Sequence, residues 1–217
     1  MRVFILCSGR SGSSAFIEAC QYITNYTASH ESRVREVGEE RFGYPDDHIE
    51  ADNRLSWFLG EMDSKFGDRP YYVHLKRDRD KVARSYMKRY YQPESIIDAF
   101  SGGIGMKPPA AQDRKTLLQL CYDYVDTVHA NIDLFLKDKT HVLDIQLESI
   151  EEDFVRFWEW IGAEGDLQKA LDEFRVRHNA SARRNPNFLK RFKLIFLRES
   201  RNIIWWLRSL FSRSSSR

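Results

Sequence analysis

The chain has few cysteines and no long uncharged apolar run. Its 217 residues include Cys7, Cys20 and Cys121, and none of them are at CxxC spacing. This sparse, odd set argues against a disulfide framework and a zinc site, so we expect a reducing compartment and a cytoplasmic protein. No run reaches the roughly 18 apolar residues of a spanning helix. The apolar opening at residues 3–7 is too short for a secretory signal.

The chain also lacks a strong charge of one sign. Its 34 Lys and Arg residues nearly balance 32 Asp and Glu residues, which gives a net charge of +2. A general basic field for nucleic acid is therefore not indicated, and any anion site must be local. The hydrophobic fraction of 42% is sufficient for the core of one α/β domain of ordinary size.

Short β-branched and aromatic runs alternate with segments of helical periodicity. The runs predict strands at residues 3–7, 26–29, 71–75 and 141–145. The apolar spacing predicts helices at residues 13–23, 50–66, 117–135 and 149–161, with another from the third strand to about residue 91. Ser149 and Glu152 have the spacing of a capping box. We expect an α/β fold with three α/β/α layers, a mainly parallel central sheet and one domain over residues 1–185.

Residues 7–14 form a polar turn between the first strand and the first helix. Such a turn points backbone N–H groups at one spot, where the helix dipole favours an anion. Ser13 and Ser14 add hydroxyl donors, and Arg10 adds a cationic fork. Position 14 is not glycine and no lysine follows, so a conventional NTPase P-loop is disfavoured. A serine-rich N-cap of a structural helix fits this turn equally well.

A second basic motif follows the third predicted strand. Arg77 lies just beyond the strand, and Ser85 is eight residues further along the next helix. Both can reach one anion only if Arg77 folds back across the strand–helix turn. Residues 76–84 carry many charges of both signs, so a solvated helix start is the simpler interpretation of this motif alone.

Together the two motifs resemble the superfamily of sulfotransferases that use 3′-phosphoadenosine-5′-phosphosulfate (PAPS), in its prokaryotic form. Residues 10–14 match that family's Lys/Arg-Ser-Gly-Thr/Ser-Thr/Ser loop at every position. Arg77 and Ser85 match its later arginine–serine pair in order and spacing. Residues 142–145, followed by an acidic helix, are a looser likeness. The resemblance covers about residues 2–180 and implies a P-loop NTPase-like fold.

The resemblance implies a role for each matching residue. The first loop would hold the 5′-phosphosulfate of the donor through Arg10, Ser11, Gly12, Ser13 and Ser14. Arg77 and Ser85 would hold the 3′-phosphate. Transfer would be an in-line displacement at sulfur without a metal, in which the Arg10 charge stabilises the bridging oxygen. The acceptor hydroxyl would belong to a small molecule, carbohydrate or lipid.

The general base would lie at the end of the second strand, where the family places His or Glu. Here His30 and Glu31 are adjacent. Neighbouring residues of an extended chain point to opposite sides, so only one should face the donor, and we favour Glu31. In the alternative interpretation, His30 packs in the structure and Glu31 is merely solvated.

Two departures from the family concern the adenosine end of the donor. Ala15 stands where many members have a tryptophan that stacks on adenine. The Arg-Lys-Gly element that closes over the 3′-phosphate is also missing. Arg183 and Arg184 would either replace it by charge alone or form a loop of solvated arginines. A P-loop small-molecule kinase and a nucleotide-binding protein without sulfotransfer activity therefore stay as alternatives, as does a non-catalytic scaffold.

Two further segments bear on partners. Residues 46–54 are densely polar and would either orient a polyhydroxylated acceptor, such as a sugar or glycolipid, or form an acid-rich helix start. Residues 186–217 combine bulky apolar residues with many Lys and Arg, which predicts a basic amphipathic helix and tail. That helix would either contact a membrane peripherally or pack on the domain. The acceptor's identity and the oligomeric state cannot be inferred from these patterns.

Overall fold

The computed structural model describes residues 1–90, 92, 95–107 and 112–175. These residues form two compact units, of which the first contains residues 1–85 and 122–175 and the second contains residues 86–121. The predicted boundary at residue 185 and the predicted C-terminal helix lie outside the described residues, as do Arg183 and Arg184.

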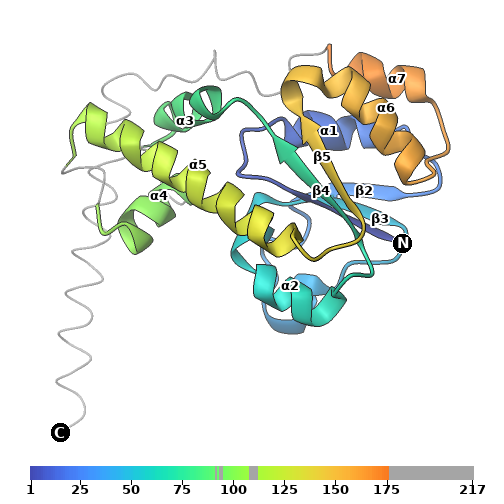
Figure 1. Ribbon diagram of the computed structural model, residues 1–217, viewed down its shortest axis with the longest axis horizontal. Helices are drawn as coiled ribbons and strands as arrows, with labels where there is room; N and C mark the ends of the chain where they lie inside the picture. Colours follow the sequence, from blue (N-terminus) through green and yellow to red (C-terminus); the bar gives the residue numbers. More distant parts are fainter. Residues whose placement is uncertain (91, 93–94, 108–111, 176–217) are drawn as a thin grey trace, which may run out of the picture. The chain divides into compact units, whose positions relative to one another are not determined.

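A parallel sheet of five strands is the centre of the first unit (Figure 1). The strands are β1 (Arg2–Leu6), β2 (Thr27–His30), β3 (His48–Ala51), β4 (Tyr71–Lys76) and β5 (Val142–Gln146). Their order across the sheet is β2-β3-β1-β4-β5, and every neighbouring pair is parallel. The four predicted strands are confirmed to within one residue at each end.

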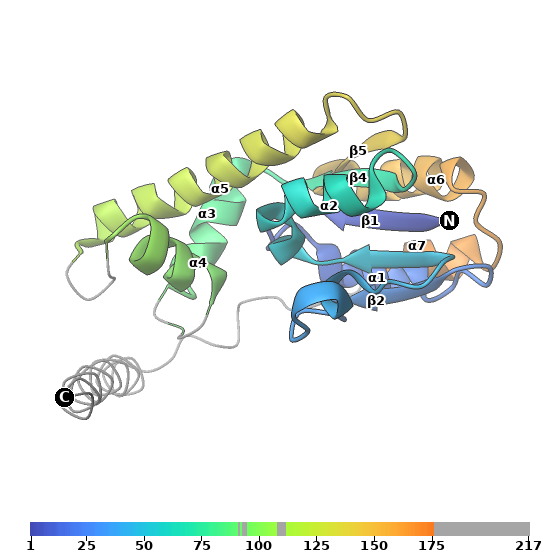
Figure 2. The same cartoon turned by 90° about the horizontal axis from the view of Figure 1, so that it is seen from below.

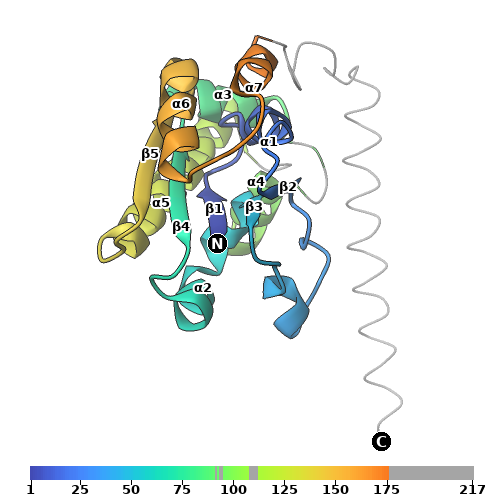
Figure 3. The ribbon, with the colours of Figure 1, turned by 90° about the vertical axis from the view of Figure 1, so that its right-hand side faces the viewer.

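Helices cover both faces of this sheet. One face carries α1 (Ser13–Cys20), α6 (Ile150–Trp160) and α7 (Leu167–Glu173), and α2 (Leu59–Phe66) lies on the opposite face (Figure 3). Successive β1 side chains alternate between the two layers, because Val3 and Ile5 join the core under α1 whereas Phe4 stacks with Phe66 and Tyr72 on the α2 side. The predicted three-layer α/β/α architecture is therefore confirmed.

The remaining elements follow β4 along the chain. α3 (Arg79–Met87) begins after Asp78, whose carboxylate accepts a hydrogen bond of 2.8 Å from the Lys81 N–H. The second unit contains α4 (Ile96–Ala99), the π-helical turn η3 (Phe100–Ile104) and the start of α5 (Arg114–Leu136), which ends in the first unit. α3, α4 and α5 are labelled in Figure 2. No described helix combines the length and apolar character needed to cross a bilayer.

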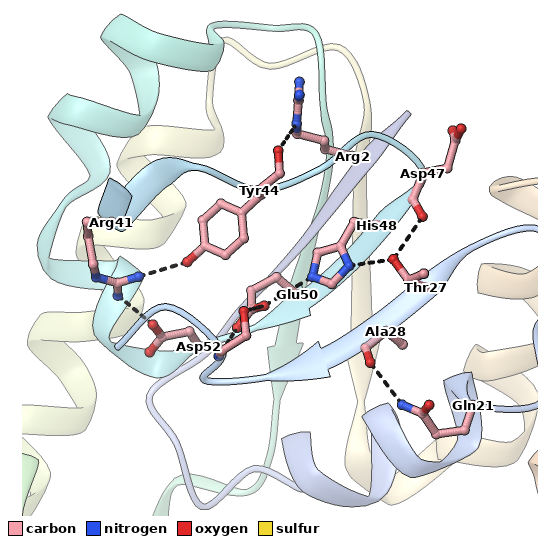
Figure 4. A network of polar contacts seen from close by, with 11 residues as sticks. Arg2, Gln21, Thr27, Ala28, Arg41, Tyr44, Asp47, His48, Glu50 and Asp52 are labelled. Carbon is pink, nitrogen blue, oxygen red and sulfur yellow. Dashed lines mark hydrogen bonds and ion pairs between the residues drawn. The ribbon is translucent and has the colours of Figure 1, made fainter. Parts of the chain in front are cut away.

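The predicted helix at residues 50–66 is wrong over its first half. Its N-terminal part is strand β3, followed by the 3₁₀ helix η2 (Asn53–Trp57), and only α2 is α-helical. All four residues of β3 are buried between β1 and β2. Two of them are polar, and the structure pairs both internally (Figure 4). Because its buried residues include polar ones, β3 lacks the apolar run that predicts a buried strand.

The predicted capping box at the start of α6 is also wrong. Ser149 is the N-cap residue, but its side chain does not cap the helix. The Ser149 hydroxyl instead donates to the Asp153 carboxylate at 2.9 Å, and that carboxylate also accepts the Gln146 N–H at 2.7 Å. Asp153 therefore ties the end of β5 to α6. The buried face of α6 consists of Phe154, Phe157 and Trp158, and it continues at the C-cap residue Ile161.

Candidate anion-binding site

The candidate residues follow the carboxyl ends of the strands. β1 connects to β2 on one side of the sheet, whereas β4 connects to β5 on the other side. Open parallel sheets bind ligands at such a switch point, in the crevice beyond the carboxyl ends of the strands. Arg10 follows β1 and Arg77 follows β4, which is the neighbouring strand. The two basic motifs therefore lie at the same edge of the sheet, after neighbouring strands.

The loop after β1 adopts a conformation that only a few residue types tolerate. Gly9, Arg10 and Gly12 have φ values of 76°, 59° and 93°, in the left-handed region. Backbone amides in such a loop form a concave surface that favours an anion. Gly12 is the N-cap of α1 and has no capping side chain, which removes the serine-rich N-cap as an explanation of this turn. A Cβ on Gly12 would lie 2.5 Å from Cδ1 of Leu147.

The two basic motifs meet in the structure. The Arg10 Nε donates to the Ser85 hydroxyl at 3.1 Å, and the Arg77 Nη1 donates to the Arg10 carbonyl at 2.9 Å. Arg77 and Ser85 therefore both contact Arg10. Its Nε atom is buried and has no hydrogen-bond partner among the described residues. A buried, unpaired guanidinium N–H costs free energy, which a hydrogen bond to an acceptor would recover.

The side chains of His30 and Glu31 point to different partners. The His30 Nε2 lies 3.0 Å from the Ser13 hydroxyl, at the start of α1. The Glu31 carboxylate forms an ion pair of 3.0 Å with Arg54, and each side chain is about one third exposed, at 32% and 33%. The φ of Glu31 is 54°, so the chain turns sharply there. His30 therefore contacts Ser13, at the end of the loop after β1, whereas Glu31 contacts Arg54, which follows β3.

Several side chains of the polar run at residues 46–54 are engaged in contacts within the protein. Glu50 is fully buried and accepts hydrogen bonds from the Ser32 N–H and from His48, at 2.9 and 3.2 Å. Asp52 is also buried, and its carboxylate pairs with Arg41 (Figure 4). Burial raises the pKa of Asp52. Both carboxylates are therefore occupied within the protein. Residues 48–51 are strand β3, and Asp52 caps η2 by accepting a hydrogen bond of 2.8 Å from the Arg54 N–H, so a helix begins only at the end of the run.

A cavity of about 620 Å³ opens beside Arg77, at the carboxyl ends of β4 and β5. Glu148 and Ser149 from the turn after β5 line it, together with His129 and Asp133 from α5. The sequence patterns did not identify this cavity. Its lining combines the second basic motif, at residues 76–78, with two segments that carry no motif.

A buried histidine pair lies next to this cavity. The His74 Nε2 is 2.7 Å from the His129 Nδ1, and the His74 Nδ1 is 3.1 Å from the Asp133 carboxylate. Burial and the nearby charge of Lys76 lower the pKa of His74 to about 4. The pair is therefore neutral at physiological pH.

Two other kinds of chemistry have little support in the described part of the chain. Cys7, at the start of the loop, is fully buried, and burial raises the pKa of its thiol, which does not suit a nucleophile. Among the described residues, no group of three or more His, Cys, Asp or Glu side chains is arranged to hold a metal ion.

Comparisons with known proteins give a likeness to solved structures. No family model matches the chain, and no curated protein matches it. The mouse sulfotransferase SULT7A1, whose crystal structure is a complex with PAP, aligns with a TM-score of 0.45 and 17% sequence identity. The alignment covers 83% of this chain and 61% of that one, so this chain spans less than two thirds of the mouse protein.

Proposed function

We propose that this protein is a sulfotransferase that moves the sulfuryl group of PAPS to an acceptor hydroxyl. The contact between the two basic motifs carries this proposal. Arg10 donates a hydrogen bond to Ser85, and Arg77 donates one to the Arg10 carbonyl. Both bonds join residues that are far apart in the sequence. A nucleotide with phosphates at both its 5′ and 3′ positions needs two adjoining cationic sites of this kind.

Each end of the donor has its own set of residues in this proposal. The amides of residues 8–14 and the N-terminus of α1 hold the 5′-phosphosulfate, together with Arg10 and the hydroxyls of Ser13 and Ser14. Arg77 and Ser85 hold the 3′-phosphate, which distinguishes the donor from ATP. The unpaired Nε of Arg77 supports this assignment because it is a buried donor in need of an acceptor.

The transfer is an in-line displacement. The acceptor oxygen forms a bond to sulfur while the bond between sulfur and the 5′-phosphate oxygen breaks, which releases adenosine 3′,5′-bisphosphate (PAP). Arg10 stabilises the charge that develops on that bridging oxygen, and it acts electrostatically because a guanidinium stays protonated. A base on the protein accepts the hydroxyl proton.

We assign the base to His30, which departs from the preference for Glu31 based on the sequence. The His30 ring lies 3.0 Å from Ser13, in the loop that holds the reacting end of the donor. The Glu31 carboxylate is engaged with Arg54. Glu31 then orients Arg54 beside the reacting centre and does not take the proton itself.

Ligand-induced stabilisation tests the proposal. The Tm should rise with PAP and not with ATP and Mg²⁺, because only PAP has a 3′-phosphate for Arg77 and Ser85. Stabilisation by ATP and Mg²⁺ without any by PAP would instead indicate a P-loop kinase or another nucleotide-binding protein. Radiolabelled PAPS with a panel of phenols, amines, glycans and lipids then tests transfer itself.

A further inference from the structure

A groove of about 840 Å³ lies beside the Glu31–Arg54 ion pair, all within the first unit. One wall is the turn at residues 34–42, which includes the 3₁₀ helix η1 (Gly38–Phe42). The other wall runs from Arg54 to Lys65, along η2 and α2. This volume is within the range of pockets that bind small molecules.

The groove has an apolar, aromatic centre. Phe42 and Phe58 meet edge to face across it, with ring centroids 6.1 Å apart. Val37 on the rim is 83% exposed, and Phe58 is 37% exposed. A ligand with an apolar body would cover surface that now faces water, which favours its binding.

The charges around the groove leave two carboxylates without an ion pair. The three cations that line it are already paired, Arg41 with Asp52, Arg54 with Glu31 and Lys65 with Glu39. Within the part of the chain that the structure describes, Glu36 and Glu61 line the groove without any cationic partner. The excess of negative charge favours a cationic ligand and disfavours an anionic one.

The groove adjoins the proposed reacting centre through Arg54. Arg54 lines the groove and also forms an ion pair with Glu31. His30, which precedes Glu31 in the chain, contacts Ser13 at the start of α1. A molecule in the groove can therefore extend a hydroxyl past Arg54 toward His30, with the rest of its body between the two walls.

We propose that this groove holds the acceptor, and that the acceptor is a small amphipathic amine with an apolar body, a protonated amino group and a hydroxyl. The proposal rests on the proposed function and names its substrate class. Its hydroxyl oxygen attacks sulfur, the bond between sulfur and the 5′-phosphate oxygen breaks, and His30 takes the hydroxyl proton. The products are a sulfate ester that retains the ammonium group, and PAP.

Three phenols of equal body and different charge test the proposal: tyramine (cationic), para-ethylphenol (neutral) and para-hydroxyphenylacetate (anionic). With saturating PAPS, kcat/KM should fall in that order. The same order should appear in direct calorimetric binding to the protein with PAP bound, a measurement that does not depend on turnover. An equal or better result with the neutral or anionic phenol would overturn the proposal.

Variants locate the effect in the groove. The double variant Glu36→Gln/Glu61→Gln should reduce the preference for tyramine over para-ethylphenol about tenfold, and the KM for PAPS should not change. Glu18→Gln, an exposed carboxylate on α1, is the matched control and should keep the full preference. A double variant with the wild-type preference overturns the groove assignment. Failure of the wild-type protein to bind PAP would instead refute the proposed function.

Discussion

At the scale of single residues, the proposed 3′-phosphate site depends most on Arg77. Its Nη1 donates a hydrogen bond to the Arg10 carbonyl, while its buried Nε has no hydrogen-bond partner in the described structure. Arg77→Ala should therefore weaken PAP binding about 100-fold, as expected for the loss of a charge-assisted hydrogen bond and its ion pair. Isothermal calorimetry measures this directly. Arg77→Lys should recover only part of the affinity, because lysine cannot reproduce the guanidinium fork.

Arg10 should behave differently, because the proposed function places it beside the bond that breaks. Arg10→Ala should lower kcat by about 100-fold, with a smaller change in the Kd for PAP. Steady-state kinetics and calorimetry on the same preparation separate the two effects. Equal losses in kcat and in PAP affinity for both arginine variants would contradict the division of roles between the two motifs.

Variants of the adjacent residues His30 and Glu31 test which of the two is the general base. With saturating donor, His30→Ala should lower kcat by about 10² to 10³, the usual contribution of a general base. Glu31→Gln should have a smaller effect on kcat, since it removes the ion pair with Arg54 and not the base. Both variants should bind PAP normally. The reverse ranking of the two variants would return the base to Glu31.

Gly12 controls the geometry of an element, the start of α1. Gly12→Ala should destabilise the fold by about 2 kcal/mol, because alanine is strained at positive φ and its Cβ would press on Leu147. Urea denaturation measures the change. Gly60→Ala on α2 is the control, since nothing lies within 4 Å of its Cβ, and it should leave stability equal or slightly higher. Equal stability of the two variants would show that the turn tolerates a side chain.

The contact between β4 and α5 makes stability depend on pH through His74 and His129. Burial lowers both pKa values, that of His74 to about 4. The unfolded chain takes up protons near pH 6.5 while the folded protein does not, so acidification favours unfolding. Stability should be full above about pH 6.5 and fall by on the order of 2 kcal/mol by about pH 4.

Denaturation curves at several pH values test this dependence, and His74→Gln should flatten them. The groups that act on the pair are Lys76 and Asp144 from the sheet and Asp126 and Asp133 from α5. A wild-type profile that is flat between pH 6.5 and 4 would mean that the two imidazoles do not titrate differently in the folded and unfolded states.

The sequence predicted some elements of this fold much better than others. β1, β4 and β5 have apolar and aromatic runs that are typical of strands, and the predicted bounds agree with the structure. β3 was missed because His48 and Glu50 are polar, and their pairing with each other inside the sheet is a tertiary property. A local pattern cannot indicate which buried carboxylate will find a partner.

At the scale of the whole chain, the sequence predicted which residues form the candidate site but not how they meet. The spacing of Arg10, Arg77 and Ser85 indicated two anion motifs. Their hydrogen bonds join residues 75 and 67 positions apart, and this closeness depends on the pairing of β1 with β4. The groove at residues 34–65 could not be predicted, because its walls come from packing between a turn and a helix that carry no motif.

Calorimetry with three nucleotides tests most directly whether both motifs bind one nucleotide. PAP, adenosine 5′-monophosphate and adenosine 3′-monophosphate should be titrated into the wild-type protein and Arg77→Ala. We expect PAP to bind most tightly, and we expect Arg77→Ala to weaken PAP and the 3′-monophosphate while the affinity for the 5′-monophosphate stays the same. Equal losses for all three nucleotides, or wild-type affinity for PAP no higher than for the 5′-monophosphate, would contradict the account.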